Sequence, residues 1–309
     1  MSLLSPTRPG AARRTRGRGQ GGAAFLLLTP FFAVFGIAMV APLVYAVNLS
    51  LFTERSSGLG FGNAERVFNA PGNYWQALTS EHFQNGFATL ALYCVIYIPV
   101  MVGLAALFAL LIDATAARTG KFFQLTLFLP HAVPEVIAGL IWAYLYTPGA
   151  SPVLGVLAGR GIDIDMLGRS WVLPGVINIA VWMWTGYNMV ILYTALKAIP
   201  HETLEAARVD GAGGWTIATR IKLPMIRQAV GVVVLFTVIG SLQMFNSPMV
   251  MRSAGSALDA DYSPAMFIYH TAFGANDIGL AAAASILLAA VAGVLSWTVT
   301  RIAGRKESW

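Results

Sequence analysis

The chain has 309 residues, of which 57% are hydrophobic and only 11% are charged. Soluble domains average about 25% charged residues, so most of this chain lies in a membrane. The net charge of +6 does not indicate nucleic-acid binding, because the basic residues are not gathered on one soluble domain. The single cysteine, Cys94, excludes an intrachain disulfide and a cysteine-based metal site.

Residues 1–22 are rich in arginine and glycine, and we interpret them as a flexible basic cytosolic tail. The apolar run that follows is too long for the core of a cleaved signal peptide, so it is interpreted as a membrane span. Five more runs have membrane-spanning length. The six predicted spans lie at about 23–51, 86–112, 122–146, 171–197, 226–250 and 279–302. The sequence thus predicts an all-α membrane protein with one domain over 23–303 and a cytosolic C-terminal tail at 304–309.

The distribution of lysine and arginine predicts the orientation, because these residues favour the cytosolic side. If the N-terminus is inside, the inner segments hold five in the tail, two after span two, five around the loop after span four and three at the C-terminal end. The outer segments together hold only five. Both termini and the loop at 200–227 are therefore expected in the cytosol.

Span three contains Pro130 and Pro134, which remove helix donors and predict a kink. Glu135 is the one carboxylate clearly inside a span, where an ionised group costs roughly 2.5–3.5 kcal/mol at the helix centre. It is interpreted either as a hydrogen-bond acceptor on a translocation path or as a helix-packing tie or neutral acid. His131 is interpreted as a packing residue or as bonded to the backbone.

Spans four and five carry aromatic and amide side chains. Trp184 and Asn188 are one turn apart and share a helix face, with Tyr187 beside them. Aromatic faces can stack on sugar rings while amides bond hydroxyl groups; an interfacial aromatic belt is the alternative. Gln243 and Asn246 are three residues apart and are expected on one face of span five. They either line a polar path or tie helices together.

Seven charged residues exclude the loop at 200–227 from hydrocarbon. Pro200 predicts a helix start and Asp210-Gly211 predicts its end. A second short helix is expected from Trp215 to Lys222, ending before Leu223-Pro224. The loop is either a plain connector or a surface that docks into a groove of a soluble partner. Small residues suited to such close approach are Ala206, Ala207, Gly211 and Ala212.

The pattern Glu205-Ala206-Ala207, Asp210-Gly211-Ala212 and Ile221-x-Leu223-Pro224 resembles the "EAA" loop of binding-protein-dependent ABC-importer permeases. It departs from many relatives at Arg227 and Gln228, where they carry a proline. Three further segments resemble the larger permease subunit of the carbohydrate-uptake (maltose, glycerol-phosphate, trehalose) type. They are Tyr74 to Leu78 with Phe61-Gly62-Asn63 before it, span four up to Ala198-Ile199-Pro200, and Phe245-Asn246. Alternatively, Tyr74 and Trp75 have only a structural role, as aromatic anchors at the membrane interface.

This resemblance implies a type I ABC-importer permease core with six transmembrane helices and cytosolic coupling helices in the coupling loop (residues 200–227). It implies ATPase coupling through Glu205, Ala206, Ala207, Asp210, Gly211 and Ala212. It also implies a path for a sugar or sugar-like solute, with the candidate residues Glu135, Trp184, Tyr187, Asn188, Gln243 and Asn246.

The resemblance further implies a non-catalytic, multi-pass subunit of the bacterial inner membrane. Its partners would be a second permease, two ATPase subunits and an extracytoplasmic substrate-binding protein. ATP and magnesium would bind to the ATPase subunits, so we expect no cofactor or metal on this chain. The sequence agrees, because it has no phosphate-binding G-x-x-x-x-G-K-[ST] motif and no H-E-x-x-H motif.

Two other function classes compete with this interpretation. A secondary transporter would need an ion-coupling site, for which Glu135 is the candidate. A polytopic membrane enzyme would need a paired acid, metal or nucleophile constellation at one membrane face, and the sequence carries none that we identify. The sequence does not identify the sugar.

Overall fold

The structure is a computed structural model that describes residues 20–55, 65–114 and 117–304. The chain divides into two compact units, residues 1–48 and 49–309. Most of the predicted basic tail, together with Phe61-Gly62-Asn63 and residues 305–309, lies outside the described residues.

The first unit consists of α1 (Gln20–Phe35), the π-helical turn η1 (Gly36–Val40) and most of α2 (Ala41–Ser50). Together they contain a continuous apolar stretch, Phe25–Ser50, that is long enough to cross a membrane. This stretch agrees with the predicted first span.

The second unit begins with a two-stranded antiparallel hairpin, β1 (Phe52–Arg55) and β2 (Glu65–Phe68), followed by α3 (Ala70–Thr79). The buried amide of Asn73 joins these pieces, because its Nδ2 donates to the carbonyl oxygens of Ser50 and Phe52, both at 2.9 Å. The sequence predicted only an outer loop here. Strands this short carry too little alternation to be distinguished from a loop.

Two long helices form the core of this unit: α4 (Glu81–Asp113) and α8 (Val172–Lys197) pack along one another. The third long helix, α15 (Ile278–Gly304), runs beside α12 and α3. Buried residues recur on α4 every three or four positions, which is the spacing of a single helix face. They are Leu90, Tyr93, Tyr97, Met101, Ala105, Ala109 and Ile112.

The predicted third span is broken rather than kinked. It comprises α5 (Ala117–Phe128), the 3-10 turn η2 (Leu129–Ala132) and α6 (Glu135–Tyr146), with a bend of 94° at the break. Pro130 lies inside the 3-10 turn and Pro134 caps α6, so neither proline interrupts a helix interior. The sharp bend follows from placing both prolines between the two arms.

The predicted fifth span, 226–250, is wrong at its C-terminal end. The helix α12 (Arg227–Ser241) stops at Ser241, and a separate helix α13 (Asn246–Ser253) follows after a short break. A continuous helix would require Pro248 to donate to a carbonyl one turn earlier, which it cannot do. The break instead puts Pro248 in the first turn of α13, where no such donor is needed.

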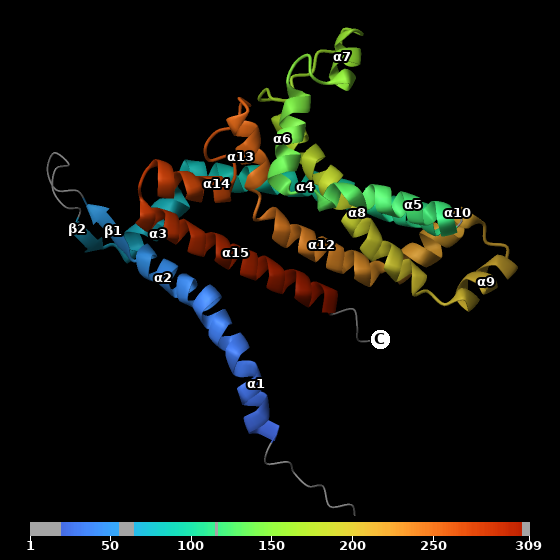
Figure 1. Cartoon of the computed structure of the whole chain (residues 1–309), viewed down its shortest axis with the longest axis horizontal. Helices are drawn as coiled ribbons and strands as arrows, with labels where there is room; N and C mark the ends of the chain where they lie inside the picture. Colours follow the sequence, from blue (N-terminus) through green and yellow to red (C-terminus); the bar gives the residue numbers. More distant parts are fainter. Residues whose placement is uncertain (1–19, 56–64, 115–116, 305–309) are drawn as a thin grey trace, which may run out of the picture. The chain divides into compact units, whose positions relative to one another are not determined.

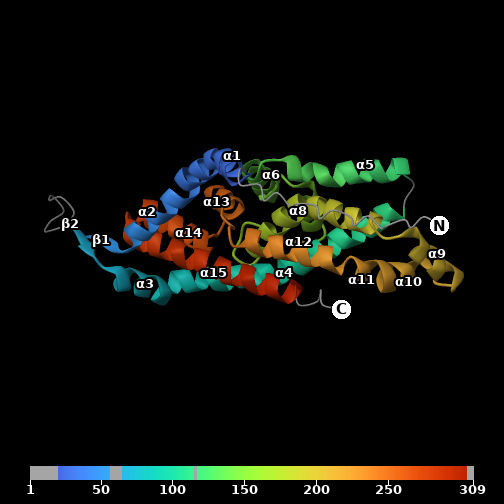
Figure 2. The ribbon, with the colours of Figure 1, turned by 90° about the horizontal axis from the view of Figure 1, so that it is seen from below.

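The remaining elements are short. The coupling loop forms α9 (His201–Val209), α10 (Gly214–Thr216), the π-helical turn η3 (Ile217–Lys222) and α11 (Leu223–Met225). Figures 1 and 2 show α9 and α10 at one end of the second unit and the β-hairpin with α3 at the opposite end. The others are α7 (Pro152–Ala158), α14 (Pro264–Tyr269) and the π-helical turn η4 (His270–Gly274).

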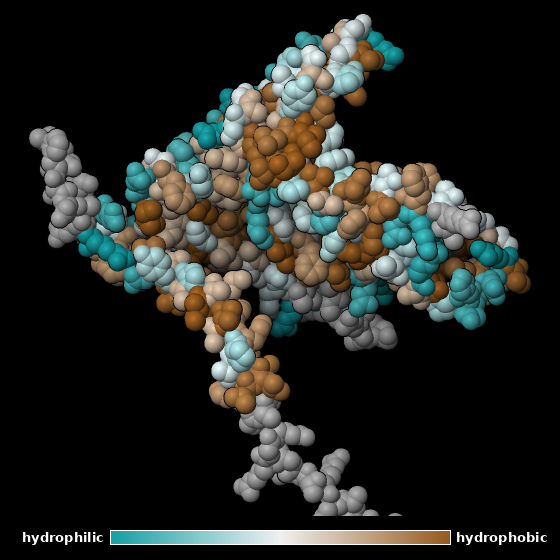
Figure 3. All heavy atoms as spheres, in the orientation of Figure 1, coloured by the Kyte–Doolittle hydropathy of each residue, from teal (hydrophilic) through white to brown (hydrophobic). Residues whose placement is uncertain are grey.

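Hydrophobic and hydrophilic residues gather on different parts of the second unit. Hydrophobic residues cover the base of α6, whereas hydrophilic residues gather at the end that carries α9 and α10 (Figure 3). Within the described residues, four helices are long and apolar enough to cross a membrane, and the count rises to six if each of two bent helix pairs is one span. That number agrees with the six predicted spans.

Candidate solute pathway and coupling surface

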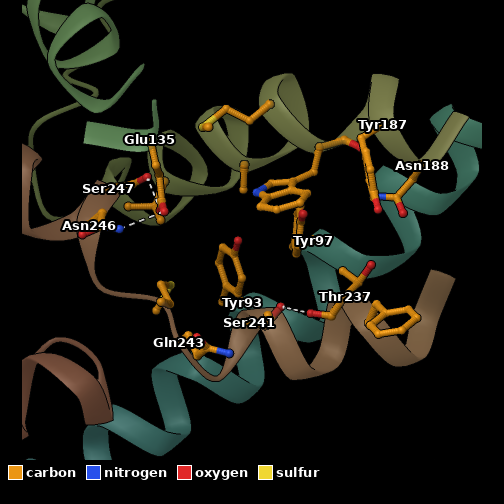
Figure 4. Close-up of a pocket in the computed structure, with 17 residues that line it drawn as sticks. Tyr93, Tyr97, Glu135, Tyr187, Asn188, Thr237, Ser241, Gln243, Asn246 and Ser247 are labelled. Atoms are coloured by element: carbon orange, nitrogen blue, oxygen red, sulfur yellow. Dashed lines mark hydrogen bonds between the residues drawn. The ribbon is translucent and has the colours of Figure 1, made fainter. Parts of the chain in front are cut away.

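A cavity of about 360 Å³ lies in the middle of the second unit, between α4, α8, α12 and the break that separates α12 from α13 (Figure 4). Its volume falls in the range typical of small-molecule sites. All six residues predicted on the path line it: Glu135, Trp184, Tyr187, Asn188, Gln243 and Asn246. The other lining residues are Tyr93, Tyr97, Val176, Ala180, Met183, Phe236, Thr237, Gly240, Ser241, Met244 and Ser247.

Two aromatic rings of α8 form one wall of the cavity, and each is 39% exposed. They are Trp184 and Tyr187, and His131 packs against both. The ring centroid of His131 lies 4.7 Å from that of Trp184 and 4.5 Å from that of Tyr187. The amide of Asn188 donates to the carbonyl oxygen of Trp184 at 2.9 Å. These ring contacts confirm the packing interpretation of His131.

The part of the cavity wall formed by α4 carries two tyrosines that the sequence analysis did not single out. Tyr93 and Tyr97 lie on consecutive turns of α4 with their rings stacked, 4.9 Å between centroids. They could have been found, because two tyrosines four residues apart on an apolar span bring hydroxyl groups to one helix face. Together with α8 they surround the cavity with aromatic side chains.

Glu135 begins α6 and reaches across to the start of α13. Its Oε2 accepts a hydrogen bond from Nδ2 of Asn246 at 3.0 Å, and its Oε1 accepts one from the hydroxyl of Ser247 at 3.1 Å (Figure 4). Glu135 therefore ties the second arm of the broken span to α13 and also lines the cavity. The two interpretations left open by the sequence are both compatible with this position.

Gln243 and Asn246 do not share a helix face, so that premise was wrong. Gln243 lies in the break after α12 and is exposed, whereas Asn246 is the first residue of α13. The two side chains nevertheless line the same cavity. Ser241 and Thr237, at the end of α12, donate to the carbonyl oxygens of Thr237 and Val233 at 2.8 and 2.7 Å.

The side chains that line the cavity are of the kinds that bind a solute through ring stacking and hydrogen bonds. Among its lining residues Glu135 is the single charged one, and there is no lysine, arginine or histidine. Hydroxyl and amide groups alternate with aromatic faces, which suits a polar, uncharged solute with many hydroxyl groups. Within the described ranges no three acidic, histidine or cysteine side chains are grouped as a metal site would require.

The coupling loop has the helix predicted for its first part. Pro200 precedes α9, which ends at Val209, and Gly211 follows with φ of +82°, a conformation that favours glycine. Of the predicted coupling residues, Glu205, Ala206, Asp210 and Gly211 are exposed and Ala212 is half-buried. Ala207 is buried, and its carbonyl accepts from the amide of Ala212 at 2.9 Å.

The second part of the loop differs from the prediction. The helix starts at Gly214 and continues through Leu223-Pro224 to Met225, instead of ending before that pair. The wide π turn of η3 ends at Lys222, two residues before Pro224, where it gives the proline ring room; Pro224 itself has no N–H to pair. Sequence periodicity does not distinguish a π turn from an α turn over so few residues.

Two large hydrophobic side chains project from the coupling loop and were missed by the sequence analysis. Val209 is 87% exposed and Trp215 is 80% exposed. These two side chains make this end of the second unit a candidate contact surface. We call this the α9–α10 surface; it comprises Glu205, Ala206, Val209, Asp210, Gly211 and Trp215.

Residues 83–307 match the family described as "Binding-protein-dependent transport system inner membrane component". The match covers the helices that form the cavity and the coupling loop. The chain belongs to that family. It is a permease of an ABC importer and a multi-pass membrane protein, as the coupling-loop pattern predicted.

Individual relatives agree with this assignment. The permease is 28% identical to the diacetylchitobiose uptake system permease protein of Streptomyces coelicolor, over 99% of this chain and 94% of the relative. It is 31% identical to the osmoprotective compounds uptake permease protein of Synechocystis, over 76% of this chain and 83% of the relative.

The fold is that of a solved transporter chain. The crystal structure of a bacterial ABC transporter involved in the import of the acidic polysaccharide alginate aligns with a TM-score of 0.79, covering 94% of the permease and 97% of that chain. The sequence identity is 21%. The predicted type I permease fold is thereby confirmed.

Proposed function

We propose that this permease and a second permease chain form an alternating-access path for a neutral sugar or sugar-like solute. In this proposal an extracytoplasmic binding protein delivers the solute, and two ATPase subunits drive the cycle. Membership of a binding-protein-dependent family supports the general assembly. The solute and the composition of the complex are inferred from the site and from the relatives.

The composition of the cavity is the observation that carries the choice of solute. Trp184, Tyr187, Tyr93 and Tyr97 offer aromatic faces, and the amides and hydroxyls around them offer hydrogen bonds. Among the residues that the structure describes, no cationic side chain lines the cavity, so an acidic sugar would find no counter-charge from them. Relatives named for lactose and trehalose transport support a neutral saccharide. The alginate importer, by contrast, is named for an acidic one.

The α9–α10 surface is proposed to dock on an ATPase subunit. A short exposed helix with small residues and projecting Val209 and Trp215 suits insertion into a groove. ATP and magnesium would be held by that subunit, with no cofactor on this chain. The excess of lysine and arginine on the inner segments supports placing this surface and both termini in the cytosol of a bacterial cell.

In this proposal the transport cycle is driven by ATP, which binds more tightly to one conformation of the complex than to the other. ATP binding closes the two ATPase subunits, and the docked coupling loop transmits that motion to the helices around the cavity. The path opens outward to receive the solute from the binding protein, and hydrolysis returns it to the inward state. Such a transition requires that ATP favours one arrangement of the helices over the other.

Uptake by the reconstituted complex tests the proposal. The permease, its second permease, the ATPase and the binding protein are placed in proteoliposomes and offered labelled maltose, trehalose, lactose and diacetylchitobiose. For the accepted sugar, Trp184→Ala is expected to lower uptake about tenfold through the loss of aromatic contact. Trp297→Ala, an exposed tryptophan of α15 outside the cavity, is the matched control and is expected to transport normally.

A further pair of variants separates stacking from hydrogen bonding. Tyr187→Phe keeps the ring that packs on His131 and removes the hydroxyl, whereas Tyr187→Ala removes both. We expect the alanine variant to lose more uptake than the phenylalanine variant. Unchanged uptake in Trp184→Ala and Tyr187→Ala would contradict the assignment of the cavity as the solute site.

A further inference from the structure

Outside the cavity, one carboxylate joins three segments of the chain at the end that carries the coupling loop. Asp113 is the last residue of α4. Its Oδ1 lies 2.8 Å from Nζ of Lys197, and its Oδ2 lies 2.5 Å from Nζ of Lys222. We call these three residues the Asp113 cluster. Sequence separations of 84 and 109 residues kept it hidden from sequence reasoning.

Burial makes this cluster more than a surface ion pair. The side chain of Asp113 is 9% exposed and that of Lys222 is 15% exposed, whereas that of Lys197 is 54% exposed. Charge-assisted hydrogen bonds of this kind are the stronger ones, and removing one partner of a buried pair leaves an uncompensated charge. The Asp113–Lys222 contact is therefore the tighter half of the cluster, and Lys197 forms its more exposed half.

The two lysines stand on either side of α9 and α10. Lys197 ends α8, just before α9, and Lys222 ends η3, just after α10. Two of the three segments that meet here, α4 and α8, line the cavity, and the third, η3, leads to a helix that does. α4 contributes Tyr93 and Tyr97, α8 contributes Trp184 and Tyr187, and η3 continues through α11 into α12 with Thr237 and Ser241.

The path from η3 to α12 contains a joint. The helical segments Gly214–Met225 and Arg227–Ser241 meet at a bend of 64°, and Lys222 lies one turn before that bend. A joint of this kind absorbs motion unless the segment before it is held. The contact between Lys222 and Asp113 holds it against α4.

We propose that the Asp113 cluster is the tie that makes the coupling loop move as one body with the helices lining the cavity. Asp113 and Lys222 are positioning residues, since neither contacts the cavity. This inference rests on the proposed function and extends it. Without the tie, motion of the docked α9–α10 surface is taken up at the bend, and ATP is hydrolysed without sugar movement.

Three variants separate this role from a contribution to stability. Asp113→Asn removes the counter-charge and leaves a single amide oxygen as the acceptor for two lysines, so it weakens the tie. Lys222→Met breaks the tie and leaves the neutral pair of Asp113 and Lys197. The double variant breaks the tie and leaves only the half-exposed Lys197. Charge balance therefore predicts that Asp113→Asn is the least stable and that the double variant recovers much of that loss.

The measurement is the number of ATP molecules hydrolysed per sugar imported, in the full complex in proteoliposomes, alongside the unfolding temperature. All three variants are expected to raise the ratio, by about fivefold or more for a coupling of ordinary size. The ATPase should still copurify. Lys121→Met, an exposed lysine on α5, is the control and should leave the ratio unchanged.

The double variant gives the decisive result. If it regains a normal ATP-to-sugar ratio together with its stability, the cluster is only structural and the inference is overturned. If its stability recovers while the ratio stays high, the tie is supported. Should Asp113→Asn fail to assemble, Lys222→Met and the double variant carry the same test. Failure of the unmodified complex to import any sugar would instead count against the proposed function.

Discussion

The coupling loop is continuous in the chain, from residue 200 to 227, whereas the cavity collects residues from α4, α6, α8, α12 and α13. The α9–α10 surface is held mainly by its own backbone bonds, such as that from Ala212 to Ala207. The cavity depends on contacts between helices, such as that of Glu135 with Asn246 and Ser247. The α9–α10 surface is formed by one short, exposed segment, whereas the cavity is formed by side chains from five separate helices.

Because the two regions are built differently, substitutions in them are expected to impair transport in two different ways. A change on the α9–α10 surface should leave the permease folded and remove its response to the ATPase. A change at a close contact behind the cavity should destabilise the fold and remove transport as a consequence. The ion cluster at Asp113 lies between these cases, because it is assembled like the cavity and serves the loop.

The largest effect is expected at Gly186, which lies on α8 between the two exposed aromatic rings. A Cβ atom at this position would overlap the backbone carbonyl of Leu127 on α5. Gly186→Ala therefore forces α5 away from α8, and overpacking of this kind costs about 1–3 kcal/mol or more. We expect a lower unfolding temperature in detergent and loss of assembled complex.

The control for this prediction is Gly231→Ala on α12, where an added Cβ would meet nothing within 4 Å. Alanine is the better helix former, so this variant should be neutral or stabilising by about 0.5–1 kcal/mol. Equal unfolding temperatures for the two variants would show that the close approach of α5 and α8 is not needed for folding.

The next effect is expected at Gly211, on the α9–α10 surface. An added side chain would meet nothing within 4 Å, but the positive φ disfavours any other residue by about 1–2 kcal/mol. Gly211→Trp should therefore fold, and it should block docking through its bulk. We expect uptake to fall at least about tenfold at normal expression, with ATP hydrolysis no longer stimulated by the loaded binding protein.

Gly211→Ala separates strain from bulk, because it carries the same backbone penalty with a single methyl group. It should retain most of the uptake that Gly211→Trp loses. Normal transport by the tryptophan variant at normal expression would remove Gly211 from the docking surface.

The same contrast explains how much the sequence could predict. The end of α9, the glycine at 211 and the small exposed residues follow from local signals that act within one turn of helix. The six path residues all line the cavity, since aromatic and amide side chains in apolar spans are few and need a polar environment. The broken third span was anticipated as a kink from its two prolines.

What the sequence could not predict depends on contacts between distant segments. The end of the fifth span is an exception, because Pro248 is a local signal that could have placed the end of this helix before residue 250. The spacing of Tyr93 and Tyr97 places their hydroxyl groups on one face of α4, but only the packing of α4 against α8 shows that this face borders the cavity. Asp113 looks like the polar end of a helix until two lysines from other segments reach it. Exposure of Trp215 is likewise a property of the folded surface.

The smallest effect is expected at Glu135, and it bears on whether an ion drives transport. Glu135→Gln keeps a carbonyl oxygen to accept from Asn246 and gains an amide that donates to the hydroxyl of Ser247, which can also accept. The tie between α6 and α13 therefore survives without its charge. We expect ATP-driven uptake to persist within about fivefold of normal, since a hydrogen bond to a neutral group is weaker than one to a carboxylate by about 1 kcal/mol.

Glu135→Ala is the paired control, because it removes both hydrogen bonds and should lower stability and uptake more than the glutamine variant does. An ion-coupled secondary transporter would behave in the opposite way, since loss of the titratable group would abolish uptake even with its hydrogen bonds intact. Uptake that requires ATP and persists in Glu135→Gln therefore assigns the carboxylate to packing of the cavity wall. Loss of uptake in Glu135→Gln would instead show that the carboxylate takes part in driving transport and does not only pack the cavity wall.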